Sequence, residues 1–305
     1  MDTTRASTRA GGRTPPHTTE DVLALATVIG EAAARGAIGR MSVPPRQRIV
    51  DEHGTKFISM PAVSADHRLF INKTATITRG PGTTVTSVVP VFSAETGGLL
   101  AVLDGARVTD LKCAAVAALV TGHCAAPGAT TLAIVGAGVQ AWQQYLAVTA
   151  VREIARVRIH SRTRRGAETF GARIRAAGPA EVTVCGSAAE ATAGADIVAT
   201  ATTSSEPLPI SAELPEHVHV NCMGAHTPTS REVGRELLER GVLVVESLDI
   251  AIAEAGEIHR SALDLAALLA TDPADLARRT TVFSSTGHAS LDLLTCSYLL
   301  TRPDR

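Results

Sequence analysis

The spacing of apolar residues changes along the chain and divides it into two parts. Residues 19–36 carry apolar and small side chains at helical spacing, behind polar residues 18–21 that are typical of a helix start. From about residue 46 to residue 103 the period falls to two, which predicts strands joined by turns. Because no helix interrupts these strands, we expect them to pair as an antiparallel sheet.

A different pattern begins near residue 130, after an alanine- and leucine-rich helix expected over 109–124. Short apolar runs alternate there with helical stretches, which predicts a Rossmann-type doubly wound parallel sheet with ligands at the carboxyl ends of its strands. The expected strands begin near residues 131, 156, 182, 195, 217, 242 and 282. The predicted fold class is therefore α/β, with this parallel sheet and a second, α+β domain that contains the antiparallel sheet.

The first parallel strand leads into the most informative motif of the chain. Residues 131–142 read Thr-Leu-Ala-Ile-Val-Gly-Ala-Gly-Val-Gln-Ala-Trp, so that a buried strand passes through Gly-x-Gly-x-x-Ala into a helix. Gly136 permits the tight turn, Gly138 lets a pyrophosphate approach the backbone, and Ala141 allows the helix to pack closely on its strand. The free N–H groups of the helix start attract phosphate. This pattern predicts a dinucleotide-binding protein.

The residues after the second parallel strand indicate which dinucleotide is preferred. An NAD enzyme generally places a carboxylate here for the ribose 2′-hydroxyl, but no acidic residue occurs between Glu153 and Glu168. Ser161 and Arg162, followed by Thr163, can instead donate hydrogen bonds to a 2′-phosphate. We therefore expect NADPH to be preferred over NADH.

Composition narrows the class of protein further. The 305 residues carry a net charge of −1, which gives no electrostatic reason to expect a nucleic acid or an anionic membrane as partner. No apolar run reaches the roughly 18 residues needed to span a bilayer. Residues 1–18 are polar and are expected to form a disordered tail rather than an export signal. The five scattered cysteines fit a reduced, cytoplasmic, metal-free protein.

Lysine is rare in this chain, and its positions are informative. Of the 29 basic residues only Lys56, Lys73 and Lys112 are lysines. Lys73 lies between apolar residues of an expected strand, and Lys112 lies on an otherwise apolar helix, where an ammonium without a partner is costly. We expect both to serve a functional site, and Lys73 to be required for turnover rather than for folding.

Several landmarks together resemble the ornithine cyclodeaminase/mu-crystallin family of nicotinamide-dependent enzymes. They occur in order from about residue 19 to residue 300 and include Met60-Pro61, Lys73, Thr84-Val-Thr86, Thr109-x-Leu-Lys112-x-Ala-Ala115, the glycine motif, Asn221-x-x-Gly224-x-x-x-Pro228-x-x-x-Glu232 and Phe283-x-Ser285-x-Gly287. The resemblance implies a homodimer that binds a small amino or imino acid. It also implies a substrate-binding and dimerisation domain of residues 19–125 with 286–305, and a dinucleotide-binding domain of residues 126–285.

The resemblance further implies roles for single residues. Arg48 would hold the substrate carboxylate, with Arg46 as the alternative, and Lys73 would face the substrate. Lys112, which replaces an arginine usual in the family, would contact substrate and cofactor, and Thr286 would lie where the two meet. The remaining implied cofactor contacts are Thr84, Gly136, Gly138, Val139, Gln140, Thr202, Met223, Gly224 and Ser285.

His226 stands where the cyclodeaminases of the family have the aspartate assigned to proton transfer. A histidine can pass a proton near neutral pH, so His226 is either a catalytic residue beside Lys73 or a bystander in a polar loop. The expected reaction is reduction of an amino-acid-derived imine with NAD(P)H. A cyclodeaminase, an amino-acid dehydrogenase and a non-enzymatic small-molecule binder remain as alternatives.

Overall fold

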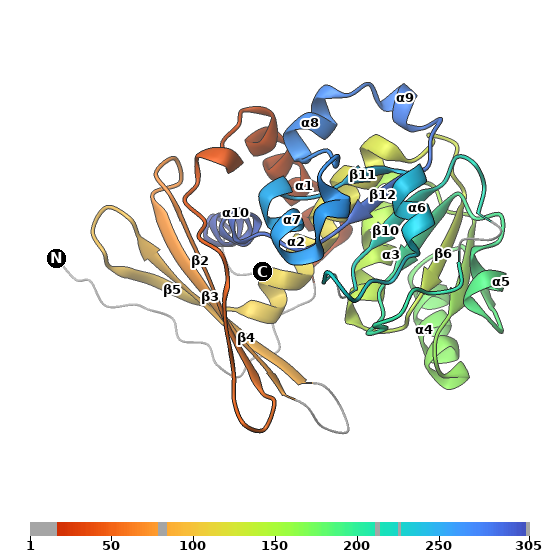
Figure 1. Ribbon diagram of the computed structural model, residues 1–305, viewed down its shortest axis with the longest axis horizontal. Coiled ribbons are helices and arrows are strands. Elements are labelled where there is room, and N and C mark those ends of the chain that lie inside the picture. The colour runs from red at the N-terminus through yellow and green to blue at the C-terminus, as the bar shows by residue number, and fades with distance from the viewer. Residues whose placement is uncertain (1–16, 79–83, 211–213, 225–226, 303–305) are drawn as a thin grey trace.

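The chain forms two sheets, one antiparallel and one parallel (Figure 1). The computed structural model describes residues 17–78, 84–210, 214–224 and 227–302. A five-stranded sheet has the order β1-β2-β3-β4-β5, and a seven-stranded sheet has the order β11-β12-β10-β9-β6-β7-β8. All pairs in the first sheet are antiparallel and all pairs in the second are parallel. The predicted α/β fold class is confirmed.

The antiparallel sheet has one buried face and one apolar face that is largely exposed. Its strands are β1 (Gln47–Val50), β2 (Lys56–Ser64), β3 (Leu69–Thr78), β4 (Thr84–Ser93) and β5 (Leu99–Asp104). Met60 lies opposite Lys73 in the register, and Ala75 lies opposite both Ile58 and Ser87. Because side chains alternate along a strand, these five residues share the buried face, which is where a site can be built.

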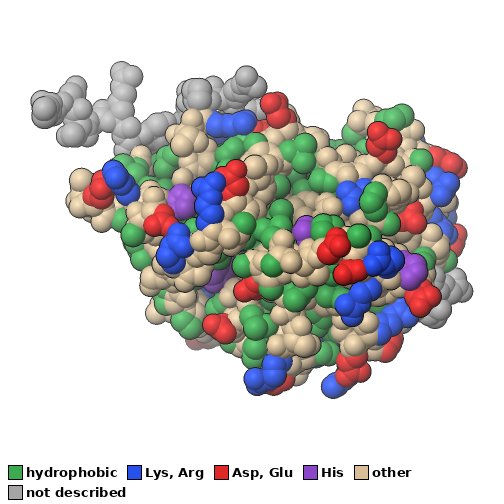
Figure 2. Space-filling view, turned by 90° about the horizontal axis from the view of Figure 1, so that it is seen from above, with side chains coloured by type: hydrophobic (Ala, Val, Ile, Leu, Met, Phe, Trp, Pro, Cys, Tyr) green, Lys and Arg blue, Asp and Glu red, His purple; other side chains and the backbone are tan. Residues whose placement is uncertain are grey.

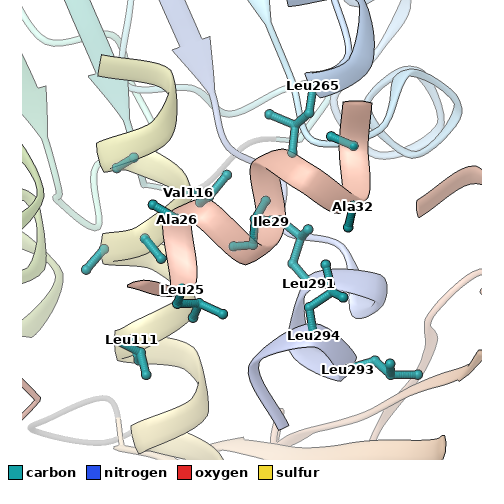
Figure 3. Packing of buried hydrophobic residues seen from close by; sticks show 14 of the residues in the cluster. Leu25, Ala26, Ile29, Ala32, Leu111, Val116, Leu265, Leu291, Leu293 and Leu294 are labelled. Carbon is teal, nitrogen blue, oxygen red and sulfur yellow. The ribbon is translucent and has the colours of Figure 1, made fainter. Parts of the chain in front are cut away.

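Two helices, α2 (Gly105–Cys124) and α10 (Ala289–Leu300), pack on the buried face, and α1 (Thr19–Ala34) packs on both of them. Leu25 and Ile29 of α1, Leu111 of α2 and Leu291 of α10 meet in one apolar core (Figure 3). Phe283 of the parallel sheet belongs to the same core. The two sheets are therefore joined by shared packing, and both ends of the chain contribute to it.

Side chains cap the helices of this layer. Thr18 and Asp21 form a reciprocal capping box at the start of α1. The Asp104 carboxylate accepts from the N–H of Ala106 at 2.8 Å, so α2 begins at Gly105 rather than near residue 109 as expected. The expectation of a disordered tail over residues 1–18 is wrong for its last two residues. Thr18 is this cap, and Nε2 of His17 lies 2.6 Å from Oε1 of Gln143. Residues 1–16 lie outside the described chain.

The parallel sheet follows the alternation expected from sequence. Its strands are β6 (Thr131–Val135), β7 (Arg156–His160), β8 (Glu181–Val184), β9 (Ile197–Thr200), β10 (His219–Cys222), β11 (Val242–Val244) and β12 (Thr281–Ser284). The helices between them are α3 (Val139–Val151), α4 (Arg164–Ala177), α5 (Ala188–Thr192) and α6 (Arg235–Arg240). Strand order β8-β7-β6-β9-β10 places the switch point at β6 and β9, beside the glycine turn.

Short helical segments complete the fold and were not predicted. They are η1 (Ile38–Arg40), α7 (Leu248–Ala255), η2 (Glu257–His259), α8 (Leu265–Ala270) and α9 (Pro273–Leu276). None is longer than eight residues, too short to show a clear helical period. In the described ranges no helix is long and apolar enough to cross a membrane. Acidic and basic side chains are interspersed over the face shown in Figure 2, as the small net charge suggests.

Buried polar side chains fix α2 on the parallel sheet. Nε2 of His219 lies 3.1 Å from Oδ1 of Asn221, and Nδ2 of Asn221 donates to Oγ1 of Thr121 at 2.9 Å. Burial lowers the pKa of His219 to about 4, so its imidazole is neutral at physiological pH. This network sets the position of α2, whose other end reaches the functional site.

Candidate active site

A cavity of about 220 Å³ lies between the buried face of the antiparallel sheet, α2, α7 and the start of α10. Its wall on the sheet side is aliphatic, with Ile58, Ala75, Ile77 and Val85. Its polar lining includes Arg46, Lys73, Lys112, Glu254, His288 and Asp292. The cavity thus combines a charged region with an apolar wall. Binding sites for small amphipathic molecules have this combination.

Lys73 and Asp292 form a buried ion pair in this cavity. Nζ of Lys73 lies 3.1 Å from Oδ1 of Asp292, and the two side chains are 8% and 3% exposed. Burial favours the protonated acid, but the charges of Lys73 and Lys112 outweigh it and lower the pKa of Asp292 below its usual value. The carboxylate is therefore ionised and holds the Lys73 ammonium in place.

Lys112 is buried on α2 and remains charged. Burial alone would lower the pKa of Lys112, but the acidic groups around it, Cys113, Asp292 and Glu246, outweigh burial and raise the pKa. Burial also raises the pKa of Cys113 and keeps its thiol protonated, so the two carboxylates are the charges that stabilise the ammonium. Lys112 therefore provides a permanent positive charge for an anionic group.

The loop between β12 and α10 is held from two sides. The Glu246 carboxylate accepts from Oγ of Ser285 at 2.5 Å and from the N–H groups of Thr286 and Gly287 at 3.0 and 3.2 Å. Nη2 of Arg46 donates to the carbonyls of Thr286 and Gly287 at 2.9 and 3.1 Å. Nε of Arg46 also lies 2.5 Å from Oε1 of Glu254. The loop therefore enters the cavity in a fixed conformation.

His288 follows this loop and lines the cavity. It is the residue before α10, and its Nδ1 lies 2.5 Å from Oγ of Ser290. Burial is the main cause of a lowered pKa, and the positive charges of Lys112 and Arg46 act in the same direction. The imidazole is therefore mostly neutral at pH 7.

The turn between β6 and α3 has the geometry of a dinucleotide site. Gly136 has φ of 123°, and a Cβ there would lie 2.4 Å from the carbonyl oxygen of Ala201, so only glycine fits. Gly138 precedes α3 without a side-chain cap, and a Cβ on it would meet nothing within 4 Å. Val139 is exposed, and Gln140 donates from Nε2 to Oδ1 of Asp110 at 2.9 Å. The uncapped N–H groups and the open space fit a pyrophosphate.

A buried carboxylate arranges the ends of β9 and β10 beside that turn. Glu232 accepts from the N–H and the Oγ1 of Thr202, each at 2.6 Å, and from the N–H of Gly224, also at 2.6 Å. A Cβ on Gly224 would lie 2.1 Å from Cδ of Glu232, so this contact requires glycine. Met223 lies between these anchored positions. The arrangement places Thr202, Met223 and Gly224 at the carboxyl edge of the sheet, where the nicotinamide half is expected.

The segment after β7 lies next to the glycine turn. Thr163 caps α4 by accepting from the N–H of Gly166 at 3.2 Å, and Oγ of Ser161 donates to the Thr163 carbonyl at 3.3 Å. A Cβ on Gly166 would lie 4.0 Å from Cβ of Ala137 in the turn. Arg162 is exposed and forms no ion pair with any described residue. It is therefore free to contact an anion.

The model of the ornithine cyclodeaminase/mu-crystallin family matches residues 17–302 of the sequence. The chain belongs to this family. The resemblance drawn from its landmarks is confirmed, and the position of each landmark can be considered within the family fold.

Several known proteins are similar to this chain over most of their length. Ketimine reductase mu-crystallin of Mus musculus is 35% identical over 271 residues, covering 86% of this chain and 85% of the relative. Delta(1)-pyrroline-2-carboxylate reductase of Bacillus cereus is 32% identical over 233 residues, covering 72% and 71%. The Thermococcus litoralis Delta(1)-pyrroline-2-carboxylate reductase, solved with NADH and L-proline, superposes with a TM-score of 0.80 at 25% identity and 93% coverage of both chains.

The arginine that the family pattern placed at the substrate carboxylate does not line the cavity. Arg48 is exposed on β1 and does not line the cavity, whereas Arg46, the alternative, does. The two arginines are two residues apart in the chain, but Arg46 precedes β1 and contacts Glu254 of α7 and the carbonyls of Thr286 and Gly287. The cavity lining therefore favours Arg46, the alternative, as the residue to propose for the carboxylate.

Some of the other expected site residues lie together at the cavity, and others lie outside what the structure describes. Lys73, Lys112 and Thr286 line the cavity, and Ser285 anchors its loop through Glu246. Thr84 opens β4 beside Val85 of the cavity wall, but its side chain lies outside what the structure describes. His226 lies outside the described residues altogether.

Sequence reasoning missed five polar residues of the site: Glu232, Glu246, Glu254, His288 and Asp292. Each is a single polar residue without a local motif, except that Glu232 belongs to the family landmark Pro228-x-x-x-Glu232. One signal was available for Asp292, because an acidic residue in the otherwise apolar final helix needs a buried partner.

Proposed function

We propose that this chain is an NAD(P)H-dependent oxidoreductase that reduces an imine derived from an amino acid. The supporting observation is the arrangement of Arg46, Lys73 and Lys112 around one cavity, next to a turn built for a dinucleotide. Helix α2 connects the cavity with the turn. Lys112 of this helix lines the cavity, and the Asp110 carboxylate accepts a hydrogen bond from Gln140 of the turn. Mouse ketimine reductase and the Bacillus reductase, which cover most of the chain, bear names that agree with this reaction.

In this proposal the positive groups bind the substrate carboxylate. Arg46 uses Nε and Nη2 for contacts within the protein, which leaves its other edge for the carboxylate, and Lys112 adds a second charge. Lys73 is held by Asp292 and provides a hydrogen-bond donor at a fixed point. A bound nicotinamide supplies the hydride that is transferred to the imine carbon.

The aliphatic wall of the cavity favours a substrate with an apolar ring or side chain. Ile58, Ala75 and Ile77 lie together on the sheet face, and Lys73 lies next to Ala75 on the same strand and face. A cyclic imino acid places its carboxylate and nitrogen at the charged groups and its methylene groups on this wall.

For the cofactor we propose a preference for NADPH over NADH. Ser161 and Arg162 stand where a 2′-phosphate would lie, and the exposed Arg162 has no acidic partner in the described chain. No carboxylate lies between Glu153 and Glu168 to repel the phosphate.

For the assembly we propose a homodimer formed through the outer face of the antiparallel sheet. Phe57, Phe70, Val88 and Val102 are exposed on this face, opposite in parity to the cavity residues. A sheet face that exposes several large apolar side chains is characteristic of a protein–protein contact.

The reaction is tested with purified protein, NADPH or NADH, and a panel of cyclic imino acids, keto acid plus amine mixtures, and ornithine. Net loss of the reduced-nicotinamide absorbance with an imine supports the proposed reductase. Ammonia release from ornithine without net cofactor turnover identifies a cyclodeaminase instead. Binding of small molecules with neither reaction identifies a non-enzymatic binder and removes the proposal.

A further inference from the structure

His288 lies at the centre of the charged part of the cavity. It follows Gly287, and a Cβ on Gly287 would lie 3.3 Å from Nζ of Lys112. Glu246 and Arg46 fix the loop that leads to it, through the contacts to Thr286 and Gly287. The imidazole is therefore held beside the groups expected to bind the substrate carboxylate.

One nitrogen of the ring is available to a ligand. Nδ1 lies 2.5 Å from Oγ of Ser290, and in the neutral tautomer with Nδ1–H as donor the lone pair is on Nε2. Nε2 makes no hydrogen bond to any residue in the described ranges, although His288 lines the cavity. A molecule in the cavity is thus the partner that remains for Nε2.

The other charged groups around the cavity are held by partners of opposite charge. The Lys73 ammonium is paired with Asp292, Arg46 is paired with Glu254, and Lys112 is stabilised as a cation. Within the described lining, His288 is the side chain whose usual pKa lies closest to neutrality, while Glu254, whose pKa is raised by burial, is paired with Arg46.

We infer that Nε2 of His288 exchanges the proton with the substrate nitrogen, which makes His288 a catalytic residue of the proposed reaction. In reduction, hydride adds to the carbon of the protonated imine, the C=N π electrons become the lone pair on nitrogen, and the imidazolium Nε2–H gives its proton to that lone pair, which leaves the amine as its ammonium form. The neutral imidazole then takes a proton from solvent. In oxidation, neutral Nε2 removes the ammonium proton, and the nitrogen lone pair forms the C=N bond as hydride leaves Cα. The role depends on the proposed reaction being correct.

The direction of the pH dependence follows from this role. Burial, Lys112 and Arg46 lower the pKa of His288, and Glu246 and Asp292 act against them without cancelling the effect. Reduction needs the imidazolium, so kcat/KM for the imine is expected to fall as pH rises through a pKa below the usual value for histidine. Oxidation needs the neutral ring, so kcat/KM for the amino acid is expected to rise through the same pKa.

The variant that separates this role from folding is His288→Asn. Its amide can replace Nδ1–H as donor to Ser290, and asparagine is a good residue before a helix, but no group replaces Nε2. His67→Asn is the matched control, because Nδ1 of His67 makes the same kind of contact, 2.9 Å from Oγ of Ser64, and His67 does not line the cavity.

We expect His288→Asn to melt near the wild type and to lose about 10²–10⁴ in kcat/KM in both directions, together with the pH limb assigned to the imidazole. The assays use Δ1-pyrroline-2-carboxylate for reduction and L-proline for oxidation. His67→Asn should match the wild type in rate and pH profile. An active His288→Asn enzyme with the wild-type pH profile overturns the role, as does a loss of rate that merely follows a lowered Tm.

A second measurement does not depend on turnover. The imidazole NMR signal of His288, assigned by its absence in His288→Asn, should shift on addition of L-proline, while the signal of His67 stays fixed. No shift at saturating L-proline in a wild type that oxidises L-proline also overturns the role. A wild type inactive on the whole panel removes the proposed reaction itself, and the role of His288 with it.

Discussion

The side chain of Gln140 donates to the carboxylate of Asp110 at 2.9 Å and so joins the start of α3 to α2. Burial is the main cause that raises the pKa of Asp110 to about 6, with a smaller contribution from Asp104, while Gln140 and Lys73 oppose the rise. A carboxyl group beside the phosphate turn therefore changes its charge close to physiological pH.

Cofactor affinity should depend on this charge. Above about pH 6 the ionised Asp110 disfavours a diphosphate at the start of α3, whereas below that pH the neutral acid does not. Asp110→Asn keeps an acceptor for Gln140 and should bind NADH about two- to fivefold more tightly at pH 8 in low salt, with no difference at pH 5. NADH is the suitable probe because it lacks the titrating 2′-phosphate. The exposed Glu95→Gln serves as control, and a difference that persists at pH 5 contradicts the explanation.

Lys73→Ala should lose both activity and stability. The rate is expected to fall by about two to four orders of magnitude. Because the buried Asp292 carboxylate loses its hydrogen bond, the free energy of unfolding should fall by about 3 kcal/mol, measured by denaturant titration. This revises the expectation from sequence that Lys73 matters for turnover alone. Adding Asp292→Asn to Lys73→Ala should restore part of the stability but none of the rate. An unchanged stability of the single variant contradicts the ion pair's structural importance.

The two arginines near β1 provide a matched pair for the carboxylate contact. Arg46→Ala should raise KM for the imino acid about 10- to 100-fold, the loss usual for a charge-assisted hydrogen bond. Arg48→Ala should change KM less than about threefold, because Arg48 is exposed outside the cavity. Steady-state kinetics at saturating cofactor measure both. A larger rise in KM for Arg48→Ala than for Arg46→Ala would show that Arg48, rather than Arg46, binds the carboxylate.

The proposed preference for NADPH is tested at Arg162. Arg162→Ala should weaken NADPH binding relative to NADH by on the order of 1.5–3 kcal/mol. Dissociation constants of both cofactors, from nicotinamide fluorescence, give this difference directly. Arg164→Ala is the control, since Arg164 is nearby but paired with Glu168 at 2.9 Å. Equal affinities in the wild type, or a preference that Arg162→Ala leaves in place, remove the proposal.

The proposed dimer is tested by a charge on the outer sheet face. Val88 is 44% exposed on β4, and Val88→Asp should convert a dimer to a monomer in sedimentation or light scattering, because a buried unpaired carboxylate is costly at an interface. Leu23 on α1 is similarly exposed at 40%, and Leu23→Asp should leave the assembly unchanged. A wild type that is monomeric at micromolar concentration contradicts the proposed interface.

The sequence predicted those parts of the molecule whose signals are local. The glycine turn, the strand that precedes it and the helix that follows are adjacent in the chain, so Gly136 and Gly138 could be assigned roles from spacing alone. The period-two region likewise predicted the antiparallel sheet. The dinucleotide half of the site therefore needed no tertiary information.

The substrate half could not be predicted in the same way, because its contacts join distant residues. Lys73 and Asp292 are 219 residues apart, and the sequence marked only the lysine as unusual. Arg46 and Arg48 differ in role because α7 places Glu254 against the first of them, and α7 itself was too short to be recognised. Because lysine is rare in this chain, Lys73 could be singled out as a candidate site residue. Histidine is more frequent, so nothing in the sequence marked His288 as a site residue.

The position of α10 in the chain has a consequence for synthesis. This helix packs on β2 and β3 and contributes Leu291 and Leu294 to the core that α1 and α2 share, yet it follows the entire parallel sheet in the chain. Until α10 has been synthesised, the nascent polypeptide exposes the apolar surface that α10 covers, including Ile71. This interval lasts while the entire parallel sheet is being translated. A polypeptide cut short before Ala289 is therefore expected to aggregate rather than to form a smaller working enzyme.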